Sequence, residues 1–264
     1  MKPKAENHEK IDPVVIDRIL EVHQGECQYW LLGTEPIVHN RLSEKARHEL
    51  LMPGGRKTAV ERQLVLKHEP YNEYRASPYR MPADTPTAIG ILAASFKKAL
   101  MAAALDLPGA KKAQIGRLVW VTGEVNRMYT PIYGVPQIML APVRSADINR
   151  TPDIRSRAVC PRWACHLTVR YVEPLIKEQA ITRLMAAAGM YIGVGDWRKE
   201  KGSGTFGSFE LRPPDDPEWH EVVEAGRREV QVAALEKPEC YDLETLDLLT
   251  WFDAERNRRQ MKGV

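Results

Sequence analysis

The sequence has 264 residues, 44% of them hydrophobic and 28% charged, which suits one large domain or a core with insertions. It has no apolar run near the ~18 residues of a membrane span, and its Met-Lys-Pro-Lys-Ala-Glu start lacks the apolar core of a signal peptide, so no membrane association is expected. Four scattered cysteines indicate a reduced, cytoplasmic compartment. Cys160, Cys165 and His166 have metal-ligand chemistry but no second ligand pair follows, so neither a metal nor another cofactor is expected.

The net charge is only +3, yet it is unevenly distributed along the chain. Residues 97–127 carry six cations against two acids, and residues 144–170 carry six arginines against two aspartates. Residues 236–253 reverse the balance, with six acids and one lysine. Arginine grips phosphate through its planar fork and stacks on bases. The middle of the chain therefore predicts an anion-binding track, and the acidic end predicts a surface that meets the basic region of a neighbouring copy.

The first half of the chain predicts a strand at 26–32, a helix at 43–52, a long irregular segment at 67–87, a helix at 93–105 and a strand at 115–122. The helix at 93–105 has the strongest signal, because Phe96 and Leu100 share one face. Ser95, Lys97 and Lys98 lie near its start. Backbone amides and the helix dipole favour a phosphate at such a position.

The second half predicts a strand-like run at 131–141, an arginine-rich connection at 142–158, a strand at 163–172, a helix at 174–188 and a strand at 206–211. The helix is expected to begin at Pro174 and to stop at Gly189, because helices favour proline at the start and glycine after the end. Beyond Pro213, an acidic amphipathic run at 243–252 predicts a helix in the tail.

A glycine-rich basic loop lies between the second helix and the last strand. It contains Gly193, Gly195, Trp197, Arg198, Lys199, Lys201, Gly202 and Gly204. Glycine at this density lets a backbone approach a ligand closely, and the cations indicate an anionic ligand. Two simpler interpretations stay open: the glycines serve only turns, and the tryptophan caps the hydrophobic core. A dinucleotide-binding loop is not indicated, because the glycines follow a helix and precede a strand.

Without its insertions, the predicted order is strand, helix, strand, strand, helix, strand. This βαββαβ order predicts an α+β fold with a ferredoxin-like, RRM-like core. The core is expected within residues 1–212, with insertions at 34–92 and 131–160, the second of which includes a thumb-like basic loop. Residues 213–264 are expected to form an acidic helical tail.

This core, a first helix opened by Ile-Leu-Ala-Ala-Ser95-Phe-Lys97, and the glycine-rich loop together resemble the RAMP superfamily over residues 26–212 in outline. The resemblance is to the backbone subunits that polymerise along guide RNA in CRISPR effector complexes. It implies a non-catalytic subunit that binds single-stranded RNA or DNA, stacks head to tail with copies of itself and contacts other effector-complex subunits. With the charge pattern, it predicts these nucleic-acid-binding residues: Ser95, Lys97, Lys98, Arg144, Arg150, Arg155, Arg157, Arg162, Gly193, Gly195, Trp197, Arg198, Lys199, Lys201, Gly202 and Gly204.

Three alternatives use the same features differently. A phage-type single-stranded DNA-binding protein on this fold has the same pattern, because the choice of RNA or DNA depends on contacts to the 2′-hydroxyl. An RNA-processing or nucleic-acid-cleaving enzyme is a second alternative, with Asp147 or Asp153 as its acid, although both acids equally suit pairing with neighbouring arginines. A metal-dependent nuclease needs several convergent carboxylates, so a non-enzymatic role is expected. A protein-interaction module that binds an acidic partner is the third.

Overall fold

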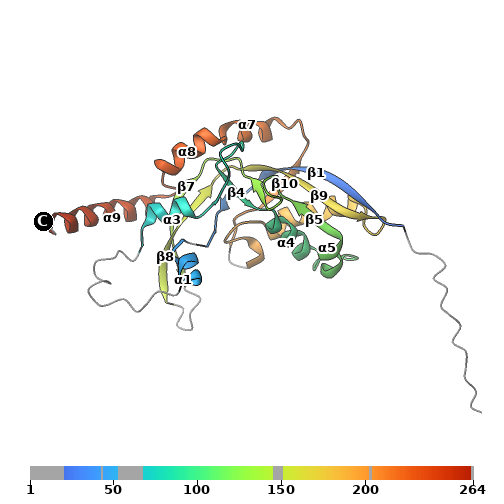
Figure 1. The fold of residues 1–264 in the computed structure, drawn as a ribbon, viewed down its shortest axis with the longest axis horizontal. Coiled ribbons are helices and arrows are strands. Elements are labelled where there is room, and N and C mark those ends of the chain that lie inside the picture. The colour runs from blue at the N-terminus through green and yellow to red at the C-terminus, as the bar shows by residue number, and fades with distance from the viewer. Residues whose placement is uncertain (1–20, 43, 53–67, 145–150, 202–203, 263–264) are drawn as a thin grey trace, which may run out of the picture.

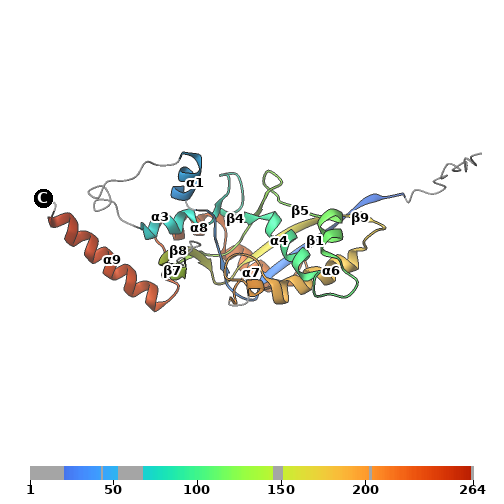
Figure 2. The same cartoon turned by 90° about the horizontal axis from the view of Figure 1, so that it is seen from below.

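The computed structural model describes residues 21–42, 44–52, 68–144, 151–201 and 204–262. They form helices and antiparallel sheets, which confirms the expected α+β class. The molecule is elongated, with the largest sheet and its helices in one half and the long C-terminal helix projecting from the other end (Figures 1 and 2). Within the described ranges, no helix is both long and apolar enough to cross a bilayer.

The largest sheet has four antiparallel strands in the order β10–β1–β9–β5. In that order the strands span Phe209–Arg212, His23–Gly33, Ala164–Glu173 and Val119–Thr122. β1 confirms the strand predicted at 26–32, and its side chains alternate between buried and exposed because helices pack on one face of the sheet. The strand predicted at 206–211 starts later, at Phe209, because Gly207 has a φ of +75° and leaves the extended conformation.

α4, at Ala93–Ala103, packs against β5 and confirms the helix predicted at 93–105. The strand predicted at 115–122 is only half correct, because its first part belongs to a short helix, α5, at Lys112–Leu118. Ile115 is the buried residue of α5, which packs against α4. A single apolar position does not distinguish a helix from a strand, so the pattern was ambiguous there.

α6, at Glu178–Ala187, lies beside α4 and carries the sequence between β9 and the glycine-rich loop. It begins after Pro174, because the residue before Glu178 still has an extended conformation. Gly189 does not stop it, because a π-helical turn at Ala188–Ile192 follows directly. The helical segment ends at Gly193, whose φ of +77° only glycine adopts readily.

A second sheet joins three strands in the order β2–β8–β7. They span Ile37–Val38, Pro152–Cys160 and Gln137–Arg144. β7 and β8 pair along their whole length, from Gln137 opposite Val159 to Arg144 opposite Pro152. The prediction of an arginine-rich, thumb-like loop at 142–158 is therefore wrong: this segment belongs largely to a β-hairpin, and residues 145–150 between its strands lie outside the described part of the chain.

The stretch predicted to be irregular, 67–87, contains regular elements in its described part. α3 spans Pro70–Ala76 and begins with a proline, which suits the first helical position. A third sheet, in the order β3–β4–β6, follows at Tyr79–Arg80, Ile89–Leu92 and Tyr129–Pro131. β4 leads directly into α4, so this small sheet determines where α4 begins. The helix predicted at 43–52 is present as α1, Glu44–Leu51.

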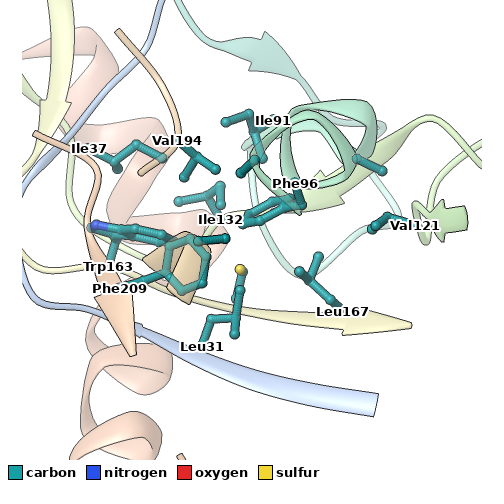
Figure 3. Close-up of a cluster of buried hydrophobic side chains, with 14 of the residues drawn as sticks. Leu31, Ile37, Ile91, Phe96, Val121, Ile132, Trp163, Leu167, Val194 and Phe209 are labelled. Atoms are coloured by element: carbon teal, nitrogen blue, oxygen red, sulfur yellow. The ribbon is translucent and has the colours of Figure 1, made fainter. Parts of the chain in front are cut away.

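The hydrophobic core lies between the four-stranded sheet, α4 and the loops that connect the two halves (Figure 3). Phe209 is at its centre, because the ring of Phe96 lies 6.0 Å from it and the ring of Trp163 lies 6.2 Å from it, both edge-on. Trp163 also donates its indole N–H to the Glu35 carbonyl at 2.8 Å. Each such buried aromatic side chain stabilises the fold by roughly 1.5–3 kcal/mol.

Three helices form the C-terminal segment: α7 at Pro217–Ala225, α8 at Arg228–Glu236 and α9 at Leu243–Lys262. Trp219 and Val222 of α7 pack with Leu32 of β1 and Ala164 of β9, so α7 covers part of the large sheet. α8 inserts the fully buried Gln231 between backbone segments. Its Oε1 accepts the N–H groups of Ala88 and Ile89, and its Nε2 donates to the carbonyls of Ile132, Gly134 and Gly226.

The substitution Gln231→Leu is expected to lower the free energy of unfolding by roughly 3–5 kcal/mol, because each buried polar group left unpaired costs about 1–3 kcal/mol. Urea unfolding measures the change. The matched control is Gln114→Leu, at an exposed position of α5, with an expected effect within about 0.5 kcal/mol. Equal effects of the two substitutions would contradict the role assigned to Gln231.

Candidate nucleic-acid interface

A cavity of about 210 Å³ lies where the start of α4 meets the glycine-rich loop. Five of the predicted nucleic-acid-binding residues line it: Ser95, Lys98, Gly193, Gly195 and Arg198. Segments that are far apart in the sequence thus meet at one place. Within the described residues, no group of three or more His, Cys, Asp or Glu side chains could hold a metal ion.

The start of α4 opens into this cavity. Leu92 is its N-cap, no side chain caps the helix, and its first turn has no acidic residue. The Ala93 N–H donates to the carbonyl of Met128, the residue before β6, at 2.8 Å, which fixes the chain at this point. Ser95 is half-buried and Lys98 is exposed, both beside the cavity. The helix dipole and the ammonium group therefore act in the same direction and favour an anion here.

The glycine-rich loop is built against β2. The Asp196 N–H donates to the Val38 carbonyl at 2.9 Å, and the Gly207 N–H donates to the Pro36 carbonyl at 2.8 Å. A Cβ atom on Gly195 would lie 2.7 Å from the Val38 carbonyl oxygen, and the φ of Gly195 is +86°. Gly195 therefore allows the loop to lie close to β2 of the protein itself.

Trp197 packs against apolar side chains of the protein itself. Its ring lies 6.0 Å from that of Phe206, and both pack against the cluster of Val38, Met139 and Val159. Its backbone also approaches Gly204 so closely that a Cβ there would lie 1.6 Å from the Trp197 carbonyl oxygen. The interpretation of this tryptophan as a cap on apolar residues, left open by the sequence, agrees with this packing.

Four of the predicted arginines have acidic partners. The pairs are Arg155 with Asp153 at 3.1 Å, Arg157 with Asp196 at 3.9 Å, Arg198 with Glu200 at 2.7 Å and Arg162 with Glu221 at 2.8 Å. Of these pairs, Arg162 with Glu221 is exposed on both sides, and exposed pairs stabilise by at most about 1 kcal/mol, whereas the other three pairs are partly buried. Among the described residues, Lys97 and Lys98 have no ion-pair partner, so an anion beside them would not have to break a pair.

Arg157 connects the cavity to the hairpin. It lies on β8 and faces Asp196, which lines the cavity. Burial lowers the pKa of Arg157 from its ordinary value, and its Nε is buried without a hydrogen-bond partner among the described residues. Arg155 lies two residues earlier on the same face of β8, so the two arginines form a row that leads away from the cavity.

The remaining predicted residues lie elsewhere. Arg162 pairs with α7, away from the cavity lining, and the Lys199 ammonium group donates to the Met190 carbonyl at 3.1 Å. Lys201 ends a short 3-10 helix at Lys199–Lys201, and Arg144 is the last residue of β7. Arg150, Asp147 and Gly202 are outside the described residues. Asp153 lies on β8, where it contacts His68 at 2.7 Å as well as Arg155.

The sequence did not indicate His39, Asn40 and Tyr79, which also line the cavity. His39 is 3% exposed, its Nε2 lies 3.8 Å from the Cys160 Sγ, and burial lowers its pKa to about 4. Burial also raises the pKa of the Cys160 thiol, so this cysteine stays protonated. The three residues belong to the segment predicted as an insertion, and no local pattern connects them to α4.

Gly195→Ala is expected to destabilise the protein more than Gly109→Ala. The two glycines have φ values of +86° and +84°, so the backbone strain of about 1–3 kcal/mol is common to both substitutions. Only at Gly195 does the new Cβ meet a carbonyl oxygen, because nothing lies within 4 Å of it at Gly109. Urea unfolding of both variants gives the difference. Equal losses of stability in the two variants would show that position 195 needs glycine only for its positive φ.

The lowered pKa of His39 predicts a loss of stability on mild acidification. In the unfolded chain, His39 becomes protonated below the ordinary histidine pKa of about 6.5. In the folded protein, it becomes protonated only near pH 4. The free energy of unfolding is therefore expected to fall by roughly 2 kcal/mol between pH 7 and pH 5 through this group. His39→Gln should remove that part of the slope, and His220→Gln, at an exposed position, should keep it. Identical slopes for all three proteins would contradict the prediction.

Comparison with known proteins gives only distant structural similarity. No family model and no curated protein matches the sequence. A chain in the cryo-EM structure of the Type III-B Cmr-beta bound to cognate target RNA is similar at 13% sequence identity with a TM-score of 0.30, over 70% of this chain and 59% of that chain. This protein thus matches less than two thirds of the other chain, and a TM-score of this size does not establish a shared fold.

Proposed function

We propose that this protein is a non-catalytic subunit that binds single-stranded nucleic acid, guide RNA in the first instance, and assembles head to tail along the strand in the cytoplasm. The binding face comprises the start of α4, the cavity-lining part of the glycine-rich loop and the arginine-bearing face of the β7–β8 hairpin. The residues assigned to phosphate contacts are Ser95, Lys98, Arg155, Arg157 and Arg198.

The observation that carries this proposal is the uncapped start of α4 beside a cavity with a free lysine. Ser95 and Lys98 line that cavity, and neither side chain has a hydrogen-bond or ion-pair partner among the described residues. Arg198 lies across the cavity in a pair with Glu200. A phosphate there receives backbone N–H groups, a hydroxyl and a cation at one point, which is how helix starts bind phosphate.

The strand order supports a ferredoxin-like, RRM-like core. β1, α4, β5, β9, α6 and β10 follow one another in the chain as β, α, β, β, α, β, and their strands lie in the order β10–β1–β9–β5. In this arrangement the two central strands are the first and third, and α4 and α6 pack side by side. A core of this kind places the start of the first helix and the loop after the second helix near one another.

A place among the backbone subunits of CRISPR effector complexes is part of the same proposal. It rests on the opening Ala-Ser95-Phe-Lys97 of α4 and on the glycine-rich loop after α6. The non-catalytic part rests on Asp153, whose carboxylate contacts His68 and Arg155 and is 11% exposed. These contacts support a structural role for Asp153, in which it positions His68 and Arg155.

The proposal predicts backbone-driven binding. Affinity for single strands should fall with salt, with a slope near −0.7 for each phosphate neutralised, and should differ little between sequences. Lys98→Gln should reduce the magnitude of that slope by about 0.7, because it removes one phosphate contact. The matched control is Lys237→Gln, an exposed lysine at the end of α8, which should leave the slope unchanged.

Fluorescence anisotropy with labelled strands across a salt series measures these slopes. A flat salt response, or equal slopes for the Lys98 and Lys237 variants, would overturn the assignment of the cavity. The same titration with RNA and DNA strands of one sequence decides which sugar is preferred. Cleavage of the labelled RNA, abolished by Asp153→Asn, would replace the non-catalytic proposal with a nuclease.

A further inference from the structure

α9 packs against the rest of the protein with one side only. The Leu140 N–H donates to the Thr245 hydroxyl at 3.0 Å, and the Tyr71 hydroxyl donates to Asp253 at 2.7 Å. Leu249, between these two contacts, is 4% exposed. β7 and α3 therefore hold the helix at both contacts, and its other side faces outward in a defined orientation.

The outward side of α9 combines apolar and acidic residues. Leu243 and Leu246 are 78% and 48% exposed, and Trp251, 64% exposed, lies at the edge of this side, where it also lines a hollow with Leu140 and Ile154. Glu244 and Asp247 lie among them, are exposed, and have no ion-pair partner among the described residues. We call these five residues the α9 stripe. An exposed apolar stripe on a rigidly held helix is typical of an interaction surface, and its charges indicate a basic partner.

α5 provides a surface of complementary charge. Lys111, Lys112 and Arg117 are exposed and have no ion-pair partner among the described residues, and α5 itself contains no acid. Leu105, in the turn before α5, is 65% exposed. We call these four residues the α5 patch. Asp106, also exposed, adjoins the patch and leaves its net charge positive.

The two surfaces lie in different halves of the molecule. Figures 1 and 2 both show α9 projecting from one end of the long axis and α5 in the opposite half. They cannot meet within one copy, so a contact between them joins two copies through unlike surfaces. Such a heterologous contact leaves a free stripe and a free patch at the two ends of every assembly, which lets further copies add.

We propose that the α9 stripe of one copy binds the α5 patch of the next copy on the same strand. This inference rests on the proposed function, because the strand brings the copies together. α9 has 20 residues and is about 30 Å long, so a contact along one helix is smaller than the ~800 Å² per partner of a stable complex. The contact is therefore weak in free solution and effective on a strand, where a neighbour is present at millimolar effective concentration.

Charge reversal on each side tests the contact. Variant A is E244K/D247K, variant B is K111E/K112E, and both alter exposed side chains only. Two like-charged surfaces face each other in assemblies of A alone or of B alone. In an equal mixture, the stripe of A faces the patch of B with opposite charges, and the stripe of B faces the patch of A likewise. A matched control, E229K/E236K, alters two exposed residues of α8 that have no ion-pair partner among the described residues, and it makes the same change of net charge as variant A at a different place.

The measurement is mass photometry with oligo(U) strands of about 10 and about 60 nucleotides, the first long enough for roughly one copy. With less protein than the long strands can bind, the wild type and the α8 control are expected to give two populations, bare strands and fully coated strands. A and B alone should give evenly scattered single copies, with a roughly 10-fold or greater loss of apparent affinity for the long strand. The mixture of A and B should restore full coating.

The outcomes separate the two proposals. Normal binding to the short strand together with unchanged coating by A and B alone would overturn the stripe–patch contact and leave the proposed function in place. Loss of short-strand binding by B would show that the α5 patch binds nucleic acid rather than a second copy, which also overturns the contact. Failure of the wild type to bind any strand would overturn both proposals. Melting temperatures of all variants exclude unfolding as the cause.

Discussion

The buried amide of Gln231 is the interaction on which the arrangement of the site depends. It satisfies the N–H groups of Ala88 and Ile89 at the start of β4 and the carbonyls of the segment around Ile132. β4 ends at Leu92, which is the N-cap of α4. One side chain of the C-terminal segment thus fixes the strand that sets the position of the first helix, and with it the cavity. Without this amide, the N–H groups of Ala88 and Ile89 and the carbonyls of Ile132 and Gly134 would lose this partner inside the protein.

Much of the fold could be predicted from local periodicity. β1 and α4 have one buried face each, so their patterns repeat at the strand and helix periods and were recognised. The hairpin strand β8 was missed although Ile154 and Ala158 alternate with Arg155 and Arg157, because the charge density favoured a solvated loop. Its other face packs against α3, which only the tertiary structure reveals.

The site was predictable where chemistry and local sequence coincide. Ser95, Lys98 and Arg198 were chosen for phosphate chemistry, and the fold brings them to one cavity. The requirement for glycine at position 195 could not be predicted from the sequence. It arises from the nearby Val38 carbonyl of β2, which is far away in the sequence. The pairing of Arg155 with Asp153 was one of the open interpretations, because the two residues are close in the sequence, whereas the pairing of Arg162 was hidden, because α7 supplies its partner Glu221.

The position of Gln231 late in the chain has a consequence for synthesis. During translation, β4 and the start of α4 leave the ribosome well before α8, so their buried N–H groups remain without the amide that later satisfies them. Domains complete such long-range contacts only when the last partner is available. The start of α4, where we propose that phosphate binds, is therefore among the last features to become rigid. On the proposed function, a nascent chain does not bind a strand before its own fold is complete.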